Sequence, residues 1–204
     1  MVDKDNNQKS YAYAYDKDGN LVMELYTYND EYRSEIAYTY DEKGNRLTKT
    51  GADSLNAWEK EVYTYDKAGN QLTFDYSNST GEWRKSVSTY DKAGNRLTHD
   101  YSNYEKYWEK EVCTYDGQGN QLTNRFSDST GYWTQYTYTY DEKGNQLTSD
   151  YTNSSGSIEK LTYVYDQYGN PVSGTVTRGV VTTSHTATWK LYYNPKFAEK
   201  AEEE

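Results

Sequence analysis

The phrase Tyr-Asp-x-x-Gly-Asn occurs seven times in this sequence at a constant interval of 25 residues. The copies begin at Tyr15, Tyr40, Tyr65, Tyr90, Tyr115, Tyr140 and Tyr165, without insertion or deletion between them. A constant period of this length is typical of arrays in which each unit buries its apolar surface only by packing on its neighbours. The sequence therefore predicts a repeat array rather than one globular core.

One unit, Trp58 to Glu82, contains two stretches in which apolar and polar residues alternate, separated by turn-like segments. Alternation with a period of two, in segments rich in Tyr, Thr and Val, is typical of β-strands. We therefore expect an all-β fold: seven 25-residue hairpin repeats forming one antiparallel meander of about 14 strands. Strand twist should coil such a sheet, giving a solenoid-like array.

Tyrosine and tryptophan supply the apolar surface that this array needs. The net charge is -10 and aliphatic residues are few, a combination typical of disordered chains. However, the chain has 26 Tyr and 5 Trp, whose large rings can be buried at modest entropic cost.

The segment Asp66-Lys67-Ala68-Gly69-Asn70 predicts the first turn of each unit. Asp66 suits the first position of a type I turn, where its carboxylate accepts a backbone N–H two residues on. Gly69 suits the positive φ of a following bulge. The structural turn residues at equivalent positions include Asp41, Gly44, Asp141 and Gly144.

Counting outward from a three-residue loop places Val62 opposite Phe74, and alternation then sorts the side chains onto two faces. One face should hold Trp58, Val62, Leu72, Phe74 and Tyr76, and the other Glu61, Tyr63, Tyr65, Gln71, Thr73 and Asp75. We expect the Trp/Leu/Val face to be the packing face, turned inward by the coil.

The second turn, within residues 78–81, must preserve this sorting in the next hairpin. That requires a loop with an even number of residues, which pairs Tyr76 with Trp83 and sets Asp75 opposite Arg84 as an ordinary ion pair.

The ends of the chain depart from the repeat. We expect residues 1–10 to form an N-terminal leader, 11–173 the seven hairpins, 174–197 a degenerate capping hairpin and 198–204 an acidic tail. A cap is needed because an uncovered sheet edge presents unpaired backbone groups.

The motif Y-x-Y-D-x-x-G-N-x-L-T, as in "YTYDEKGNQLT" at residues 138–148, resembles the YD repeat of RHS-type bacterial surface and secreted proteins. The likeness covers residues 11–173. It implies a spiralling β-sheet, a bacterial, extracellular or cell-surface location, and a non-catalytic scaffold. A second likeness is to the aromatic hairpin repeats of bacterial cell-wall-binding modules.

The candidate ligand-binding residues are tyrosines on the face opposite the Trp and Leu side chains. They are Tyr13, Tyr38, Tyr63, Tyr138 and Tyr163 in one row, with Ser88 and Cys113 interrupting it, and Tyr40, Tyr65 and Tyr140 in the next, with Thr48, Thr73, Thr98, Thr123 and Thr148 between the rows. Tyrosine offers a flat apolar body and a hydrogen-bonding tip, which suits sugar rings or an extended peptide. The alternative is that these rings serve only as cross-strand stabilisation.

Other classes of function find little support. The acidic balance, 32 Asp and Glu against 22 Lys and Arg, disfavours nucleic acid, and no apolar segment is long enough to enter a membrane. Asp16–Asn20 begins like a calcium loop but has Leu21 and Thr27 where glycine and glutamate are needed. His99 and His185 do not recur in the array, so we expect no enzyme, metal or cofactor.

The expected function is therefore a repeat scaffold that binds a glycan or protein partner through aromatic rows. The alternative is a purely structural spacer or shell segment of a larger YD-repeat protein. Self-association through the Trp/Leu face or the sheet edges is a further expectation.

Overall fold

The computed structural model describes residues 8–29, 31–178 and 185–188, and every element in these ranges is a strand. The strands are β1 (Lys9–Tyr15), β2 (Leu21–Tyr28), β3 (Tyr32–Tyr40), β4 (Arg46–Asp53), β5 (Trp58–Tyr65), β6 (Gln71–Asn78), β7 (Trp83–Tyr90), β8 (Arg96–Asn103), β9 (Trp108–Tyr115), β10 (Gln121–Asp128), β11 (Trp133–Tyr140), β12 (Gln146–Asn153), β13 (Ile158–Tyr165), β14 (Pro171–Arg178) and β15 (His185–Thr188). They follow one another in sequence order in a single antiparallel sheet. The all-β hairpin array is thus confirmed.

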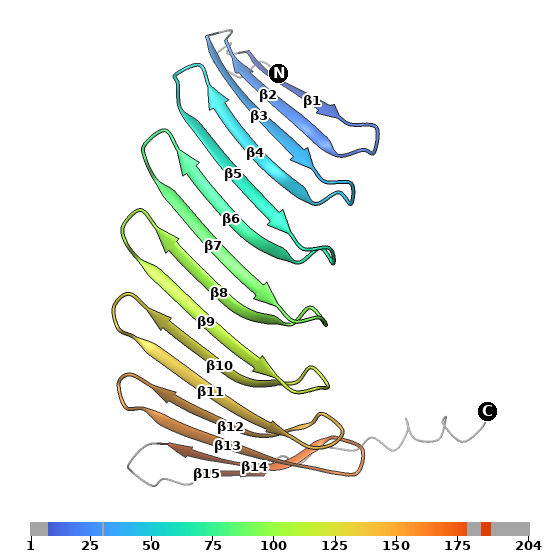
Figure 1. Cartoon of the computed structure of the whole chain (residues 1–204), viewed down its shortest axis with the longest axis vertical. Coiled ribbons are helices and arrows are strands. Elements are labelled where there is room, and N and C mark those ends of the chain that lie inside the picture. The colour runs from blue at the N-terminus through green and yellow to red at the C-terminus, as the bar shows by residue number, and fades with distance from the viewer. Residues whose placement is uncertain (1–7, 30, 179–184, 189–204) are drawn as a thin grey trace, which may run out of the picture. The chain divides into compact units, whose positions relative to one another are not determined.

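The chain divides into two compact units, Met1–Cys113 with Phe126–Gly131, and Thr114–Arg125 with Tyr132–Glu204. Within each unit, the described strands contact only the strands before and after them (Figure 1). Each hairpin therefore depends on its neighbours for burial, as expected of a repeat array.

The first turn of each unit is a three-residue loop closed by an aspartate. Asp66 donates its backbone N–H to Asn70 O at 3.0 Å, and its Oδ1 accepts the N–H groups of Ala68 and Asn70 at 2.8 and 2.9 Å. Asn70 Nδ2 also donates to Asp66 Oδ2 at 2.9 Å. Gly69 has φ +97°, a conformation that costs glycine little.

A β-bulge beside this turn makes the expected strand register wrong by one residue. Tyr65 lies opposite Gln71, but the next pair is Thr64 with Thr73, so Leu72 is an extra residue on β6. Tyr63, and not Val62, therefore lies opposite Phe74. The same shift follows the first turn in five other hairpins, β1–β2, β3–β4, β7–β8, β11–β12 and β13–β14.

The second turn also differs from the expected even loop. Asn78 N–H donates to Glu82 O and Gly81 N–H to Asn78 O, which closes another three-residue loop. Asn78 Oδ1 accepts the N–H groups of Thr80 and Glu82, as the aspartate does in the first turn. The odd loop and the bulge together preserve the parity from one repeat to the next.

The pairs across this turn are corrected accordingly. Trp83 lies opposite Ser77 rather than Tyr76, and Tyr76 lies opposite Arg84, whose guanidinium stacks over its ring at 4.3 Å. Asp75 instead lies opposite Lys85 and forms an ion pair with it at 3.3 Å.

These shifts re-sort the two faces of the sheet. The tyrosine face holds Glu61, Tyr63, Tyr65, Leu72, Phe74 and Tyr76 with their equivalents in other repeats; the tryptophan face holds Trp58, Val62, Thr64, Thr73 and Asp75 with theirs. The prediction that Trp and Val share a packing face with Leu is therefore wrong. The described residues that are most buried, Cys113, Ser86, Ser88 and Ser149, all lie on the tyrosine face.

At the C-terminal end, β15 pairs with β14 over Ser173–Val176. The remainder of the expected capping hairpin, the acidic tail and most of the N-terminal leader lie outside the described residues.

Candidate binding surfaces

In five of the seven repeats, the tyrosine of the Tyr-Asp turn donates a hydrogen bond to the backbone of the preceding hairpin. The hydroxyl of Tyr65 lies 3.0 Å from Arg46 O, the carbonyl of the first residue after Gly44-Asn45. This residue belongs to the bulge, where the regular ladder is interrupted and a carbonyl needs another donor.

The same bond recurs along the array, each time between two residues that are 19 positions apart in the sequence. Its members are Tyr40 with Leu21 O, Tyr65 with Arg46 O, Tyr90 with Gln71 O, Tyr140 with Gln121 O and Tyr165 with Gln146 O, at 2.7–3.0 Å. Three of the predicted ligand-binding tyrosines, Tyr40, Tyr65 and Tyr140, thus have their hydroxyls engaged by backbone. Burial raises the pKa of Tyr65 and Tyr140, which keeps these phenols protonated as donors.

The neighbouring row of predicted residues lies on the same face. Tyr38 donates to Glu24 Oε1 at 2.7 Å, and burial together with this carboxylate raises its pKa to about 12. Tyr63 donates to Glu61 Oε2 at 2.6 Å and accepts from Arg46 Nη2 at 2.8 Å. The hydroxyls of Tyr38 and Tyr63 are therefore also engaged by side chains of the sheet.

The rest of this row is not uniform. The ring of Tyr138 stacks on Tyr136 with centroids 6.0 Å apart and planes 5° apart. Tyr163 lies opposite Gly174, whereas Tyr13, on the edge strand, is 55% exposed. At the interruptions, Cys113 is buried, and Ser88 Oγ lies 2.9 Å from His99 Nδ1.

The threonines expected between these rows lie on the tryptophan face instead, because of the bulge. Thr64 Oγ1 and Thr73 Oγ1 are 2.7 Å apart. Equivalent hydroxyl pairs are Thr39–Thr48, Thr89–Thr98, Thr114–Thr123 and Thr139–Thr148. Each of these hydrogen bonds joins the two strands of one hairpin. The threonine hydroxyls therefore lie on the face opposite the tyrosine rows.

The tryptophan face carries an exposed aromatic row that sequence reasoning placed in the core. Trp58, Trp83 and Trp108 are 46%, 36% and 42% exposed. Ion pairs Asp75–Lys85 and Asp100–Lys110 lie on the same face. The signal that could have located this row is the Lys two residues after each of these Trp, since an alternating charged residue favours a solvated face.

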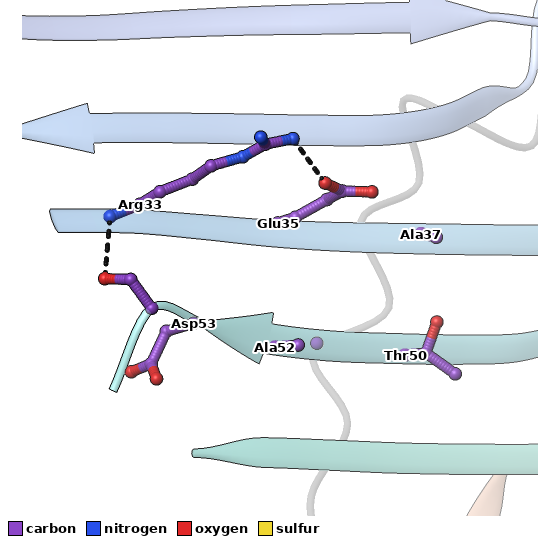
Figure 2. A pocket seen from close by; sticks show the side chains of 8 residues that line it. Arg33, Glu35, Ala37, Thr50, Ala52 and Asp53 are labelled. Carbon is purple, nitrogen blue, oxygen red and sulfur yellow. Dashed lines mark hydrogen bonds and ion pairs between the residues drawn. The ribbon is translucent and has the colours of Figure 1, made fainter. Parts of the chain in front are cut away.

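The described part of each face carries a hollow. One of about 450 Å³ lies beside the turns on the tyrosine side and is lined by Asp116, Gln118, Leu122, Tyr138 and Tyr140 among others. The other, about 380 Å³, lies on the tryptophan face (Figure 2).

This second hollow exists because its repeat has smaller or differently directed side chains than the others. Arg33, Glu35 and Ala37 stand where the next repeat has Trp58, Lys60 and Val62. The Arg33 guanidinium turns toward Glu35, with Nη2 to Oε2 at 2.8 Å, leaving Ala37 as part of the floor (Figure 2).

No protein-family model and no curated protein matches the sequence. Among solved structures, the chain is similar to the crystal structure of TcdB2-TccC3-Cdc42, with a TM-score of 0.60 and 16% identity. The match covers 87% of this chain and 10% of that one. At this identity the likeness concerns the fold alone. This chain spans about a tenth of the length of the chain in that crystal structure.

Two further matches are weaker. The TcdB2-TccC3-TEV crystal structure gives a TM-score of 0.42 at 12% identity, covering 86% of this chain and 11% of that one. A porin-like protein from Bacteroides uniformis gives 0.36 at 12% identity, covering 91% and 90%. Both scores are too low to carry an argument.

Over the described ranges, no group of three or more His, Cys, Asp or Glu side chains is placed to hold a metal ion. The same ranges contain no helix long and apolar enough to cross a membrane.

Proposed function

We propose that this chain is a non-catalytic structural scaffold, a segment of an RHS-type YD-repeat sheet in an exported bacterial protein. The observation that carries the proposal is the hydrogen bond, found in five of the seven repeats, from the Tyr-Asp tyrosine to the bulge carbonyl of the hairpin before it, as between Tyr65 and Arg46.

This bond explains why the same phrase is repeated in a structural role. Asp and Asn close the turn, Gly supplies the positive φ, the bulge frees a carbonyl, and the tyrosine of the following hairpin satisfies that carbonyl. The four fixed residues of the phrase therefore each have a role within the sheet.

The similarity to TcdB2-TccC3-Cdc42 supports a repeat sheet inside a longer chain. On this proposal the segment is a spacer or part of a shell, lies outside the cell or on its surface, and has no cofactor. Nucleic acid and the membrane interior are not partners, in keeping with the net charge of -10.

The test compares the wild type with a Tyr38→Ala/Tyr138→Ala variant by affinity electrophoresis in gels containing hydroxyethylcellulose or solubilised peptidoglycan. A scaffold should show the same mobility with and without polysaccharide in both proteins. Retardation of the wild type that the variant loses would contradict the proposal and favour a ligand site on the tyrosine rows.

A second candidate function is binding of a glycan or protein partner through aromatic residues, and the exposed row on the tryptophan face favours it. Trp83 lies between Trp58 and Trp108 in this row, and indoles left 36–46% exposed can stack on sugar rings. On this reading, polysaccharide retards the wild type, Trp83→Ala reduces the retardation, and Tyr38→Ala/Tyr138→Ala does not.

A further inference from the structure

The edge strand β1 corresponds in the repeat to β3, β5 and β7, the strands by which later hairpins contact the hairpin before them. Tyr15 occupies the position of Tyr40, Tyr65 and Tyr90 in the 25-residue repeat. Those three hydroxyls donate to a bulge carbonyl of the preceding hairpin. The Tyr15 hydroxyl has no hydrogen-bond partner among the described residues, and its side chain is 62% exposed.

Among the strands of the described ranges, β1 pairs with β2 alone. Asn29 N–H donates to Gln8 O, so by antiparallel alternation Ser10, Ala12 and Ala14 face β2 with their backbone polar groups. Tyr11 and Tyr13 direct their N–H and C=O groups to the free edge. An unpaired row of this kind is a template for another strand.

The edge lacks the usual protection against pairing. The sequence of β1, KSYAYAY, has one charged residue at its start, no proline and no bulge before Tyr15. By contrast, β14 begins with Pro171 and is covered over Ser173–Val176 by the short strand β15.

We propose that β1 docks the second strand of a YD-type hairpin from another chain, which adds to the sheet in antiparallel orientation. Its carbonyl after Gly-Asn accepts the Tyr15 hydroxyl, and its third residue after Gly-Asn pairs with Ala12, as Met23 pairs with Ala37 between β2 and β3. The inference concerns the sheet edge and goes beyond the scaffold role, since it holds whichever function the two faces have.

A second folded copy of this chain does not supply that strand. Every strand that follows a Gly-Asn in the described ranges, from β2 to β14, already has neighbours on both sides in the sheet. The partner must instead have such a strand at an open edge. The repeat-to-repeat interface within this chain provides the template for its fit.

The probe is a fluorescein-labelled peptide with the sequence of residues 83–103, the β7–β8 hairpin, titrated with the full-length chain and followed by fluorescence anisotropy. Saturable binding is expected for the wild type. Tyr15→Phe should weaken it about five- to tenfold, the effect of losing one hydrogen bond to a buried acceptor. Tyr168→Phe is the matched control, because Tyr168 is 77% exposed and lies in the last turn.

A second variant tests the backbone contribution. Tyr13→Pro removes an N–H that points away from β2, so it should abolish peptide binding while the circular dichroism of the chain stays unchanged. No binding by the wild type, or equal binding by Tyr15→Phe, would overturn the proposal.

Sedimentation of the chain alone decides the choice of partner. We expect one monomeric species at all concentrations. Concentration-dependent dimers that disappear in Tyr13→Pro would overturn the inference that the partner is a different chain. A failure of these edge experiments would leave the electrophoresis results for the two faces unaffected, so the two proposals can fail separately.

Discussion

The hydroxyl of Tyr65 in β5 lies 3.0 Å from the carbonyl oxygen of Arg46 in β4, so one hairpin satisfies a backbone acceptor of the hairpin before it. Tyr65→Phe removes this donor and leaves the ring in place. The free energy of unfolding should fall by about 1 kcal/mol, the usual net value of a hydrogen bond whose acceptor is left unpaired. Urea denaturation measures the change; Tyr168→Phe should leave the midpoint where it was.

Acid should destabilise the array through its turn aspartates. The hydrogen bond from the Asn70 side chain, followed by backbone N–H bonds, lowers the pKa of Asp66 below 3.8, and the same cause acts in the other six turns. Because the unfolded state binds protons first as the pH falls, this stabilisation is complete above about pH 4 to 5 and is lost as the pH drops through the folded pKa values.

Urea midpoints measured from pH 2 to pH 6 test this dependence. Asp66→Asn keeps the Oδ1 acceptor, as Asn78 does in the second turn, but cannot titrate. Its midpoint should therefore fall less steeply with acid than that of the wild type. Parallel slopes would show that Asp66 does not contribute to the pH dependence.

Alkali should act through Tyr38. Burial and the Glu24 carboxylate raise the pKa of this phenol to about 12, above the value of 10.0 for a free tyrosine. The unfolded chain loses the proton first as the pH rises, so the contribution of Tyr38 to stability is full below pH 10 and is lost between about pH 10 and pH 12. The difference in urea midpoint between the wild type and Tyr38→Phe should shrink over that interval.

Lys106→Gly should stabilise the chain. Lys106 has φ +65° in the second turn, where the equivalent Gly81 and Gly131 have φ +89° and +85°. A left-handed backbone costs a residue with a Cβ about 1 kcal/mol relative to glycine. Thermal unfolding should show a higher midpoint for Lys106→Gly, whereas Lys92→Gly, at a turn position without positive φ, should bring no gain.

Quenching of tryptophan fluorescence tests the placement of the indoles. Trp58, Trp83 and Trp108 are 36–46% exposed on the tryptophan face, so acrylamide should quench most of the emission of the folded chain. A buried row would give weak quenching that rises sharply in urea. That outcome would restore the packing face expected from simple alternation.

The sequence specified the hairpins but not the faces. The constant spacing from Tyr40 to Tyr65 and the Asp66-x-x-Gly69-Asn70 turn indicate local backbone geometry that needs no long-range information. The extra residue at Leu72 leaves no trace in an alternating pattern, because polar and apolar residues still alternate on both sides of a bulge. One undetected residue therefore moved Trp58 and Val62 to the opposite face.

The even loop length expected for the second turn was wrong for a related reason. In the second turn Asn78 accepts the backbone hydrogen bonds that the aspartate accepts in the first turn. Asn56 and Lys106 have the positive φ that glycine has there. The shared pattern of the two turns is thus visible in hydrogen bonds and not in residue identity. Likewise, the tyrosine hydroxyls of the candidate rows could be assigned to backbone and carboxylate partners only once the register was known.

The bond between Tyr65 and Arg46 spans 19 positions within a period of 25. Recombination between the near-identical repeats preserves every such bond when it adds or removes 75 nucleotides of coding sequence, since each new neighbour again offers its carbonyl at the same offset. An in-frame insertion or deletion of one residue within β4 or β5 would instead shift the strand register and move the Tyr65 hydroxyl away from the Arg46 carbonyl. Whole repeats are therefore the units by which such an array can lengthen or shorten while it keeps these bonds.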